Sequence, residues 1–207
     1  MPDFDKIFLF RITHIDNIPH IIKNGITHLT SQNSNPQYKS IGDSSLINNR
    51  DQFELPGGKK LGDYIPFYFG FRMPMLFVIQ NGYNGVIETK PENIVYCVTS
   101  ISLVLKHQLN FIFSNGHAVD KFSEFFESGS VNEIQTIVDF NAVKAKYWKS
   151  DSDLDLKRRK EAEFLLENNL PSNAIRKYIV YNKAVKEKLI HLGIEENLIL
   201  VSKEYYF

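Results

Sequence analysis

The chain has 207 residues, of which 43% are hydrophobic and 13% aromatic, so it has enough apolar side chains for a globular core and is not a disordered chain. Its 24 basic and 24 acidic side chains give no net charge, so any contact with nucleic acid is expected to be local. There is no apolar run of ~20 residues for a membrane helix, no signal-peptide pattern and, with the single Cys97, no internal disulfide. We expect one cytoplasmic domain spanning residues 1–207.

The N-terminal part is expected to form a strand and a helix and to continue as a long polar loop. The apolar run at residues 7–13 predicts the strand. Asp16 or Asn17 can cap a helix that runs to about residue 23, and Gly25 supplies the left-handed stop. Residues 30–60 are polar with scattered apolar side chains, which is typical of a functional loop and not of a linker.

Short strands alternate with helices along the remainder, which favours an α+β fold. Pro66 confines the strand expected at residues 64–69 to a sheet edge or a bulge. The other expected elements are a buried helix at 73–80, strands at 94–98 and 111–113 around a helix at 100–108, a mainly helical or irregular segment at 118–149, a strand at 175–181, a helix at 184–192 and a strand at 198–201. The sequence contains no G-x-G-x-x-G and no Walker loop, so the usual phosphate cradles are missing.

Glu163 is a candidate catalytic carboxylate with two interpretations. The surrounding Lys160-Glu-Ala-Glu-Phe-Leu-Leu segment contains good helix formers, so the ordinary interpretation is a surface glutamate on a helix. If Glu163 instead begins a strand at a cleft, its carboxylate can hydrogen-bond a ribose hydroxyl. It can then also stabilise the positive charge that develops as a glycosidic bond breaks.

Other side chains offer complementary chemistry, although each also has an ordinary structural role open to it. His14, between a strand and a helix, can donate to a ribose hydroxyl as a neutral imidazole. Arg50 and Arg72 offer forks of donors that suit a pyrophosphate. Tyr68 can stack on a flat ring such as nicotinamide, and His117, on a turn, can position a substrate or move a proton.

Several common site types are missing or weakly indicated. There is no His-Glu-x-x-His and no Cys cluster, so we expect no metal site. There is no Gly-x-Ser-x-Gly elbow, and Cys97 lies in an apolar strand where it is unsuited to be a nucleophile. The basic run at 157–160 is either solvated surface or a local contact with a nucleic-acid backbone.

The most specific feature of the sequence is a set of motifs in a fixed order. They are Arg11-Ile-Thr-His-Ile-Asp-Asn17, the segment Ser40–Arg50, Asp63-Tyr-Ile-Pro-Phe-Tyr-Phe with the following Arg-x-Pro-Met-Leu, and Ala162-Glu-Phe-Leu. In these motifs, and over essentially the whole chain, the sequence resembles the DarT family, the DNA ADP-ribosyltransferase toxins of bacterial DarT–DarG toxin–antitoxin pairs. It departs from the family at Met73, where a small polar residue is common.

The resemblance implies an ADP-ribosyltransferase fold, a split mixed β-sheet with flanking helices similar to the poly(ADP-ribose) polymerase catalytic core. It assigns catalysis to Glu163, Arg50 and His117, and closure over NAD to residues 30–50. The residues that it places against NAD are Thr13, His14, Ile15, Asn24, Gly42, Tyr68 and Arg72. With the basic run before Glu163, it suggests Arg158 and Arg159 as contacts to DNA.

The resemblance also implies a reaction and a partner. ADP-ribose would pass from NAD, which serves as a substrate, to a base in single-stranded DNA, releasing nicotinamide and blocking replication. Branches of the family modify thymine or guanine, and thymine is favoured here. The implied partner is a macrodomain antitoxin of the DarG type that removes ADP-ribose. No metal and no membrane are implied.

Other functions stay open from the sequence alone. An enzyme of the same fold could modify RNA or protein, with the loop at about 132–155 carrying target recognition. A non-enzymatic nucleotide-binding module would keep the cleft without the chemistry. A plain structural domain would place all of these side chains on an ordinary surface.

Overall fold

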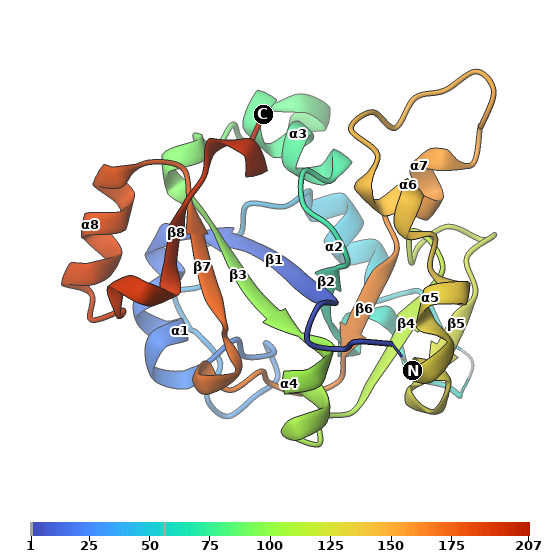
Figure 1. Cartoon of the computed structure of the whole chain (residues 1–207), viewed down its shortest axis with the longest axis horizontal. Coiled ribbons are helices and arrows are strands. Elements are labelled where there is room, and N and C mark those ends of the chain that lie inside the picture. The colour runs from blue at the N-terminus through green and yellow to red at the C-terminus, as the bar shows by residue number, and fades with distance from the viewer. Residues whose placement is uncertain (1, 56) are drawn as a thin grey trace.

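In its described residues, the protein is built around one mixed sheet of eight strands in the order β5-β4-β6-β2-β1-β3-β7-β8 (Figure 1). The computed structural model describes residues 2–55 and 57–207, so residues 1 and 56 of the expected domain and loop lie outside the described residues. The strands are β1 Phe8–His14, β2 Ile65–Tyr68, β3 Ile94–Ser100, β4 Phe111–Ser114, β5 Phe125–Glu127, β6 Glu163–Leu166, β7 Lys177–Val180 and β8 Ile199–Val201. Neighbouring strands pair antiparallel, except that β7 and β8 are parallel. The expected α+β class is therefore confirmed.

Alternating side chains of the strands build an apolar core on both faces of the sheet. In β1, Leu9 belongs to the larger core cluster and its neighbour Phe10 to a smaller one on the opposite face. The helices are α1 Ile18–Asn24, α2 Ser44–Arg50, α3 Pro74–Asn81, α4 Ile101–Lys106, α5 Ile134–Ile137, α6 Phe140–Lys144, α7 Leu156–Lys160 and α8 Lys183–His191. Apolar side chains of α1, α4, α5 and α8 cover the larger cluster, whereas α3 and Tyr206 cover the smaller one.

The sheet is split between β1 and β2, and Pro66 lies at the split. β2 pairs with β6 along its whole length, while its register pair with β1 joins Tyr68 to Phe10. Beyond that pair, the Arg11 guanidinium donates to the Pro66 carbonyl over 2.8 Å. The N and C=O of one strand residue point to the same side, so the missing N–H of Pro66 faces the split and costs no ladder bond. The expectation of an edge strand is wrong, because β2 lies inside the sheet.

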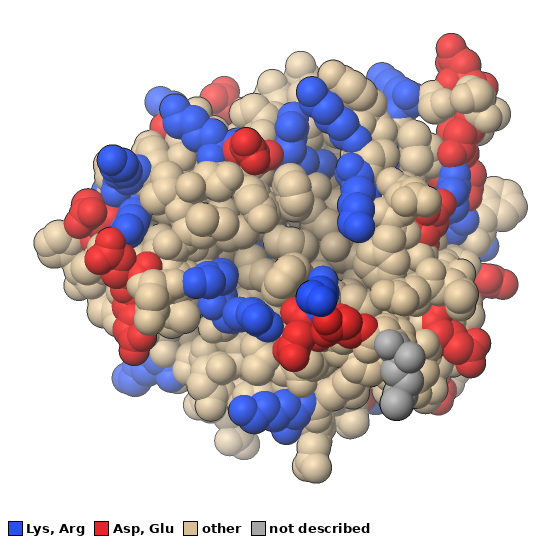
Figure 2. All heavy atoms as spheres, viewed as in Figure 1, with Lys and Arg blue, Asp and Glu red and all other residues tan. Residues whose placement is uncertain are grey.

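The other expected elements agree with the structure, apart from one helix and one strand. The stretch 30–60, expected as a loop, contains the helix α2. The helix that begins at Pro74 ends at Gly82 in the left-handed conformation, as its sequence indicates. Within the segment 118–149, the three residues of β5 form an edge strand on β4, which the sequence analysis missed. Acidic and basic side chains intermingle over the face of the molecule in Figure 2, in keeping with the zero net charge. None of the described helices is long and apolar enough to cross a membrane.

Candidate active site

Glu163 begins β6 in the middle of the sheet, and its side chain is fully buried. Its Oε1 accepts a hydrogen bond from the Ala118 amide over 3.0 Å, and its Oε2 accepts one from Nη1 of Arg50 over 2.9 Å. The surface-helix interpretation is wrong, because α7 ends at Lys160 and pairing with β2 and β4 imposes a strand. Burying a carboxylate costs desolvation free energy, even when one amide and one guanidinium bind it. Such an arrangement indicates a functional site.

The turn that follows β4 supports Glu163 from one side. The Ser114 hydroxyl accepts from the Glu163 backbone N–H over 3.1 Å and donates to the Gly116 carbonyl over 2.6 Å. The turn then carries His117 and brings the Ala118 amide onto the carboxylate. His117 is among the residues predicted from the sequence, whereas Ser114 is not, although a hydroxyl residue at the end of an apolar strand was an available signal.

Helix α2 brings Arg50 to Glu163 from the polar stretch between β1 and β2. The helix is capped by Asp43, which accepts from the amides of Ser45 and Leu46, and it contains no buried residue. Arg50, in its last turn, points inward to the carboxylate. Within residues 2–55 and 57–207, its Nη2 is buried without a hydrogen-bond partner. An orphaned donor beside a buried carboxylate fits an acceptor atom on a substrate.

His14 ends β1 and uses Nδ1 as a hydrogen-bond acceptor. Its Nδ1 accepts from the Asp16 backbone N–H over 3.1 Å. Burial lowers the pKa of His14, so the ring is neutral and its proton lies on Nε2. The exposed Asp16 carboxylate lies 3.3 Å from Nδ1, but that contact becomes an ion pair only if the ring is protonated. Nε2 is therefore the nitrogen that can donate to a ribose hydroxyl.

Asn17 fastens the long polar stretch to the end of β1. Its Nδ2 donates to the Thr13 hydroxyl and to the Lys39 carbonyl, each over 2.9 Å, and its Oδ1 accepts from the Lys39 amide over 2.8 Å. The expected cap on α1 is therefore wrong for Asn17, which stands at the cap position without a side-chain capping bond. This anchor was not predictable from local sequence, because Lys39 is distant from Asn17 in the chain.

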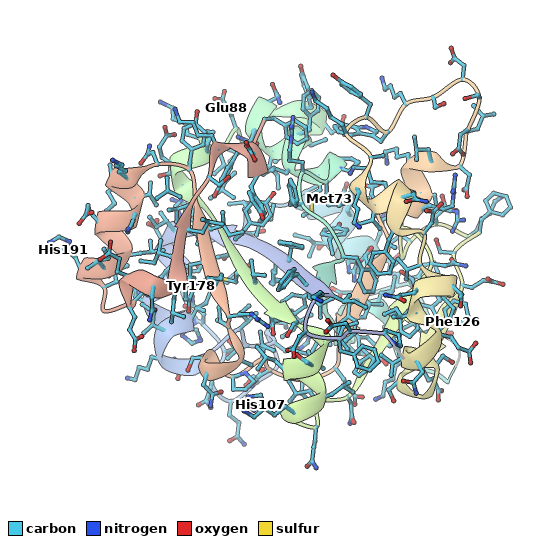
Figure 3. The ribbon with its side chains drawn as sticks, viewed as in Figure 1. Met73, Glu88, His107, Phe126, Tyr178 and His191 are labelled. Carbon is cyan, nitrogen blue, oxygen red and sulfur yellow. The ribbon has the colours of Figure 1, made fainter. Side chains whose placement is uncertain are left out.

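Tyr68 pairs with Glu163 in the β2–β6 ladder, so the two side chains lie on neighbouring strands. Burial raises the pKa of Tyr68 well above its ordinary value, and the phenol stays protonated. Tyr68, Gly70 and Met73 line a small cavity under α3. Met73 is buried between α3 and the central strands (Figure 3), where it takes the N-cap position without a capping bond. A small polar residue at this position could cap the helix, whereas this chain fills the space with a thioether.

Arg72 is fixed by aromatic residues at the end of the chain. Its backbone is left-handed at φ 53°, and its amide donates to the Tyr96 hydroxyl, which in turn donates to the Tyr205 carbonyl. The guanidinium carbon lies 4.4 Å from the centre of the Phe207 ring. In the described chain, Nε of Arg72 is buried without a partner. The residue is thus held in place with a donor free for an anionic group.

Ile15, Asn24 and Gly42 complete the set of residues expected to contact NAD, of which Tyr68 is the one that pairs with Glu163 in the described part of the chain. Ile15 follows His14 in a single helical turn, and Gly42 directly precedes α2. Asn24 lies at the C-terminal end of α1, where its amide contacts His20. Their roles stay predictions.

An open cleft of about 430 Å³ lies next to the turn that supports Glu163. It is lined by His117, Asp120, Phe122, Leu154, Asp155, Lys157, Arg158 and Glu161. Because His117 precedes the Ala118 amide that binds Glu163, the cleft and the carboxylate share one turn. The described residues hold no group of three or more His, Cys, Asp or Glu placed to bind a metal ion.

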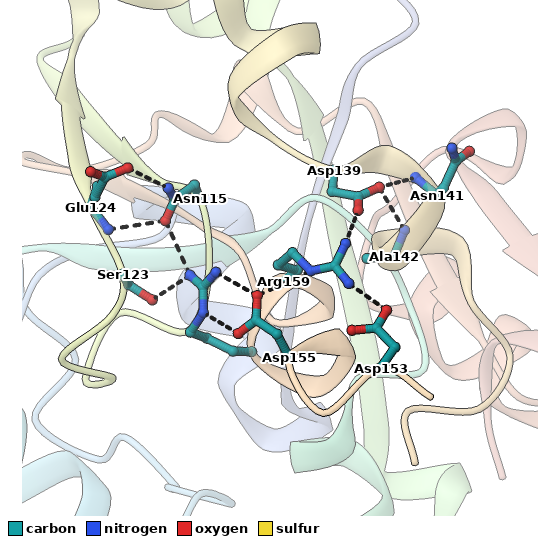
Figure 4. Close-up of polar contacts among 10 residues, drawn as sticks. Asn115, Ser123, Glu124, Asp139, Asn141, Ala142, Asp153, Asp155 and Arg159 are labelled. Carbon is teal, nitrogen blue, oxygen red and sulfur yellow. Dashed lines mark hydrogen bonds and ion pairs between the residues drawn. The ribbon is translucent and has the colours of Figure 1, made fainter. Parts of the chain in front are cut away.

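The expected DNA contacts Arg158 and Arg159 lie on α7, and both guanidiniums are engaged by carboxylates. Figure 4 shows Arg159 with Asp139 and Asp153. Arg158 pairs with Asp155, and Arg159 pairs with Asp139, Asp153 and Asp155. Neither side chain is thus free for a phosphate without breaking an ion pair, and their contact with DNA stays a prediction.

Comparison with known proteins gives consistent matches over nearly the whole chain. The family described as ssDNA thymidine ADP-ribosyltransferase, DarT, matches residues 10–207. A DNA ADP-ribosyl transferase of Thermus sp. (strain 2.9) is 33% identical over 188 residues, which is 89% of this chain and 86% of the relative. One of Escherichia coli O127:H6 is 31% identical over 196 residues, which is 93% of this chain and 88% of the relative.

Solved structures of Thermus sp. 2.9 DarT have the same fold. The complex with ADP-ribosylated ssDNA gives a TM-score of 0.86 at 28% identity, covering 100% of this chain and 98% of the other. The complex with NAD+ gives 0.80 at 29% identity, covering 100% and 99%. A fusion of DNA ADP-ribosyl transferase with DNA ADP-ribosyl glycohydrolase from Thermosipho africanus is 22% identical over 200 residues, which is 96% of this chain and 49% of the fusion. These matches confirm the expected ADP-ribosyltransferase fold, and the chain belongs to the DarT family of DNA ADP-ribosyltransferases.

Proposed function

We propose that this chain, as one domain, transfers ADP-ribose from NAD to a thymine base in single-stranded DNA and releases nicotinamide. The observation that carries the proposal is the buried Glu163 carboxylate, held between the Ala118 amide and Arg50 beside an open cleft. Family membership and the NAD+ and ADP-ribosylated ssDNA complexes of Thermus sp. 2.9 DarT support it.

NAD lies against the ends of β1 and β2 in this proposal. Nε2 of His14 donates to a ribose hydroxyl, and the ring of Tyr68 packs on nicotinamide. The free Nε–H of Arg72 faces an anionic oxygen of the pyrophosphate. Thr13, Ile15, Asn24 and Gly42 complete the predicted contacts. Because Arg50 covers the Glu163 carboxylate, binding of the ribose requires α2 to move and the ion pair to open.

The reaction breaks the bond between the nicotinamide nitrogen and C1′ of the ribose, and the bonding electrons leave with nicotinamide. Glu163 accepts a hydrogen bond from the ribose and stabilises the oxocarbenium character at C1′. In thymidine, the ring nitrogen outside the glycosidic bond is N3, which must lose its proton as it bonds to C1′. Arg50 and His117 orient the base, and the His117 side chain is the group that accepts this proton.

The single strand lies across the 430 Å³ cleft beside His117. Phe122 and Tyr147 are each 71% exposed, and lysine ammonium groups lie 5.2 Å and 5.5 Å from the centres of their rings. Exposed aromatic rings beside cations provide stacking platforms for unpaired bases. A single strand also avoids the cost of flipping a base out of a duplex, a few kcal/mol. A short footprint of this kind suits a protein without net charge.

The partner that fits this activity is a macrodomain antitoxin of the DarG type that removes the ADP-ribose. The fusion of both activities in the Thermosipho africanus relative supports the pairing. We place the protein in the cytoplasm, where NAD and DNA are both available.

The test is to incubate the protein with NAD and single-stranded oligonucleotides that differ in one base, and to weigh the products. The proposal predicts a gain of one ADP-ribose on thymine-containing strands and none with Glu163→Gln. A gain on guanine alone would correct the base. Release of nicotinamide with no modified DNA would move the target to RNA or protein, and no reaction at all would contradict the proposal.

A further inference from the structure

The two arginines of α7, Arg158 and Arg159, are held by contacts inside the protein and are not left in solvent. The Arg158 side chain is 13% exposed, and its guanidinium makes a two-point contact with Asp155, from Nε over 2.6 Å and from Nη2 over 2.8 Å. Its third nitrogen, Nη1, donates to Oδ1 of Asn115 over 3.2 Å and to the Ser123 hydroxyl over 3.3 Å. Every nitrogen of this guanidinium therefore has an acceptor inside the protein.

The Arg158 contacts converge on the turn between β4 and β5, whose residues Asn115, Ser123 and Glu124 are labelled in Figure 4. Asn115 closes that turn by donating to the Glu124 carboxylate and accepting from the Glu124 amide. The Arg158 backbone carbonyl accepts from the His117 amide over 2.9 Å. Gly116 makes the approach possible, because a Cβ there would lie 2.3 Å from Nη1 of Arg158. Arg158 thus binds the turn at Asn115 and His117, on either side of Gly116, and at Ser123 before β5.

The held turn is the one that presents the Ala118 amide to Glu163 and His117 to the cleft. We propose that Arg158 is a positioning residue for catalysis, which fixes Ala118 and His117 relative to the Glu163 carboxylate and makes no contact with DNA. The inference deepens the proposed function and rests on it for the kinetic part of its test.

The neighbouring Arg159 is bound by carboxylates of the segment 139–155, of which Leu154 and Asp155 line the cleft. It pairs with Asp139 and Asp153, and with Asp155 over 3.1 Å. Asp139 also caps α6 by accepting from the Asn141 and Ala142 amides. The two arginines therefore join the β4–β5 turn to the segment 139–155 through the shared Asp155. A DNA phosphate would have to displace carboxylates already in place, whereas a positioning role uses every contact observed.

The first test compares Arg158→Lys, which keeps the charge but loses the planar fork, with Lys149→Ala, which removes an exposed cation from the adjoining loop. Positioning predicts that Arg158→Lys lowers kcat by roughly tenfold to 100-fold and leaves the KM for the oligonucleotide and its salt dependence within about twofold. It predicts no change in kcat for Lys149→Ala. A third variant, Arg158→Ala, removes the charge as well. If it raises the KM for the oligonucleotide without changing kcat, and lowers the salt slope of binding by about one, Arg158 contacts a phosphate and the inference is overturned.

A second measurement does not depend on activity. Hydrogen exchange of the Ala118 amide, followed by NMR without NAD or DNA, should be at least about tenfold faster in Arg158→Lys and in Asn115→Ala, which leaves the Arg158–Asp155 pair intact. Unchanged exchange in both variants would overturn the inference. If the parent protein transfers no ADP-ribose, the proposed function fails, and the exchange measurement still decides whether Arg158 holds the turn.

Discussion

The two halves of the candidate site are supported in opposite ways. Glu163 begins a strand in which every residue is buried and which pairs with a strand on each side. Arg50 ends α2, a helix without a single buried residue, and yet the two side chains meet in an ion pair of 2.9 Å. The carboxylate is thus fixed by the core, while the guanidinium is carried by an element that can move at little cost in buried apolar area. The site therefore has a fixed half and a movable half.

This difference assigns separate tasks to the two halves. The fixed half must stabilise a positive charge at one point in space, which requires a preorganised carboxylate. The movable half must first let NAD in and then bring Arg50 back to the reacting base. The anchor at Asn17 holds the start of the movable stretch to β1, so the movement is confined to the residues beyond Lys39.

The largest effect is expected in the fixed half, from Glu163→Gln. The amide has the same shape but cannot stabilise the developing charge, so we expect transfer to fall by roughly 100-fold to 1,000-fold. The rate is measured by weighing the modified oligonucleotide over time. Glu167→Gln is the matched control, because its carboxylate is partly exposed and pairs with Lys59. A Glu163→Gln rate within tenfold of the parent would contradict the assignment.

A smaller effect with a different signature is expected in the movable half, from Arg50→Ala. If Arg50 orients the incoming base, kcat should fall by about 100-fold while the Kd for NAD, measured by calorimetry, changes by less than about threefold. Equal losses in kcat and NAD affinity would instead give Arg50 a binding role. The exposed Lys39 offers a control, as Lys39→Ala removes a cation from the same stretch.

Phe207→Ala tests whether the end of the chain belongs to the fixed half. Its ring lies against the Arg72 guanidinium, and a contact of this type contributes about 1 kcal/mol. We expect the Kd for NAD to rise by roughly fivefold with kcat unchanged. Tyr83→Ala is the control, because Tyr83 also packs on Phe77 but lies outside the contacts of Arg72. Similar changes in both variants would refute a specific role for Phe207.

The smallest effect is a pH dependence of stability from His14. Burial lowers its pKa below the ordinary 6.5, so the unfolded chain binds this proton more readily than the folded protein. The stability that neutral His14 contributes is fully present above pH 6.5 and is lost as the pH falls through the folded pKa. Through this one group, the free energy of unfolding changes by at most about 1.4 kcal/mol per pH unit. The free energy of unfolding, measured with urea at several pH values between 7.5 and 5.5, should fall more steeply with decreasing pH for the parent than for His14→Gln. His191, exposed on α8 at the outer edge of the molecule (Figure 3), is the control position, and a parent slope equal to that of His14→Gln would contradict the argument.

The sequence predicted the elements whose signals are local. The strand that ends at His14 and the helix that stops at Gly82 follow from apolar runs and left-handed glycine stops. Local patterns did not decide the outcome where strand pairing sets it. Glu163 lies among helix formers, and its strand interpretation is confirmed because strands from two distant segments flank it. Pro66 lies inside the sheet because the sheet is split there, which no local pattern reveals.

The candidate site was predictable as a set of residues and not as a set of contacts. The motifs predicted Glu163, Arg50 and His117, and the structure brings the first two into an ion pair. The partners of Arg158 and Arg159 were not predictable, because a basic run looks the same whether it faces water, phosphate or carboxylates from distant loops.

Hydrogen–deuterium exchange of the whole protein with and without NAD tests the division into two halves most directly. Binding of NAD should slow exchange in residues 44–50 of α2, and it should leave the already slow amides of β6, residues 163–166, unchanged. NAD binding that is confirmed by calorimetry but leaves 44–50 unprotected, or that changes β6 instead, would contradict a site with a fixed carboxylate and a movable arginine.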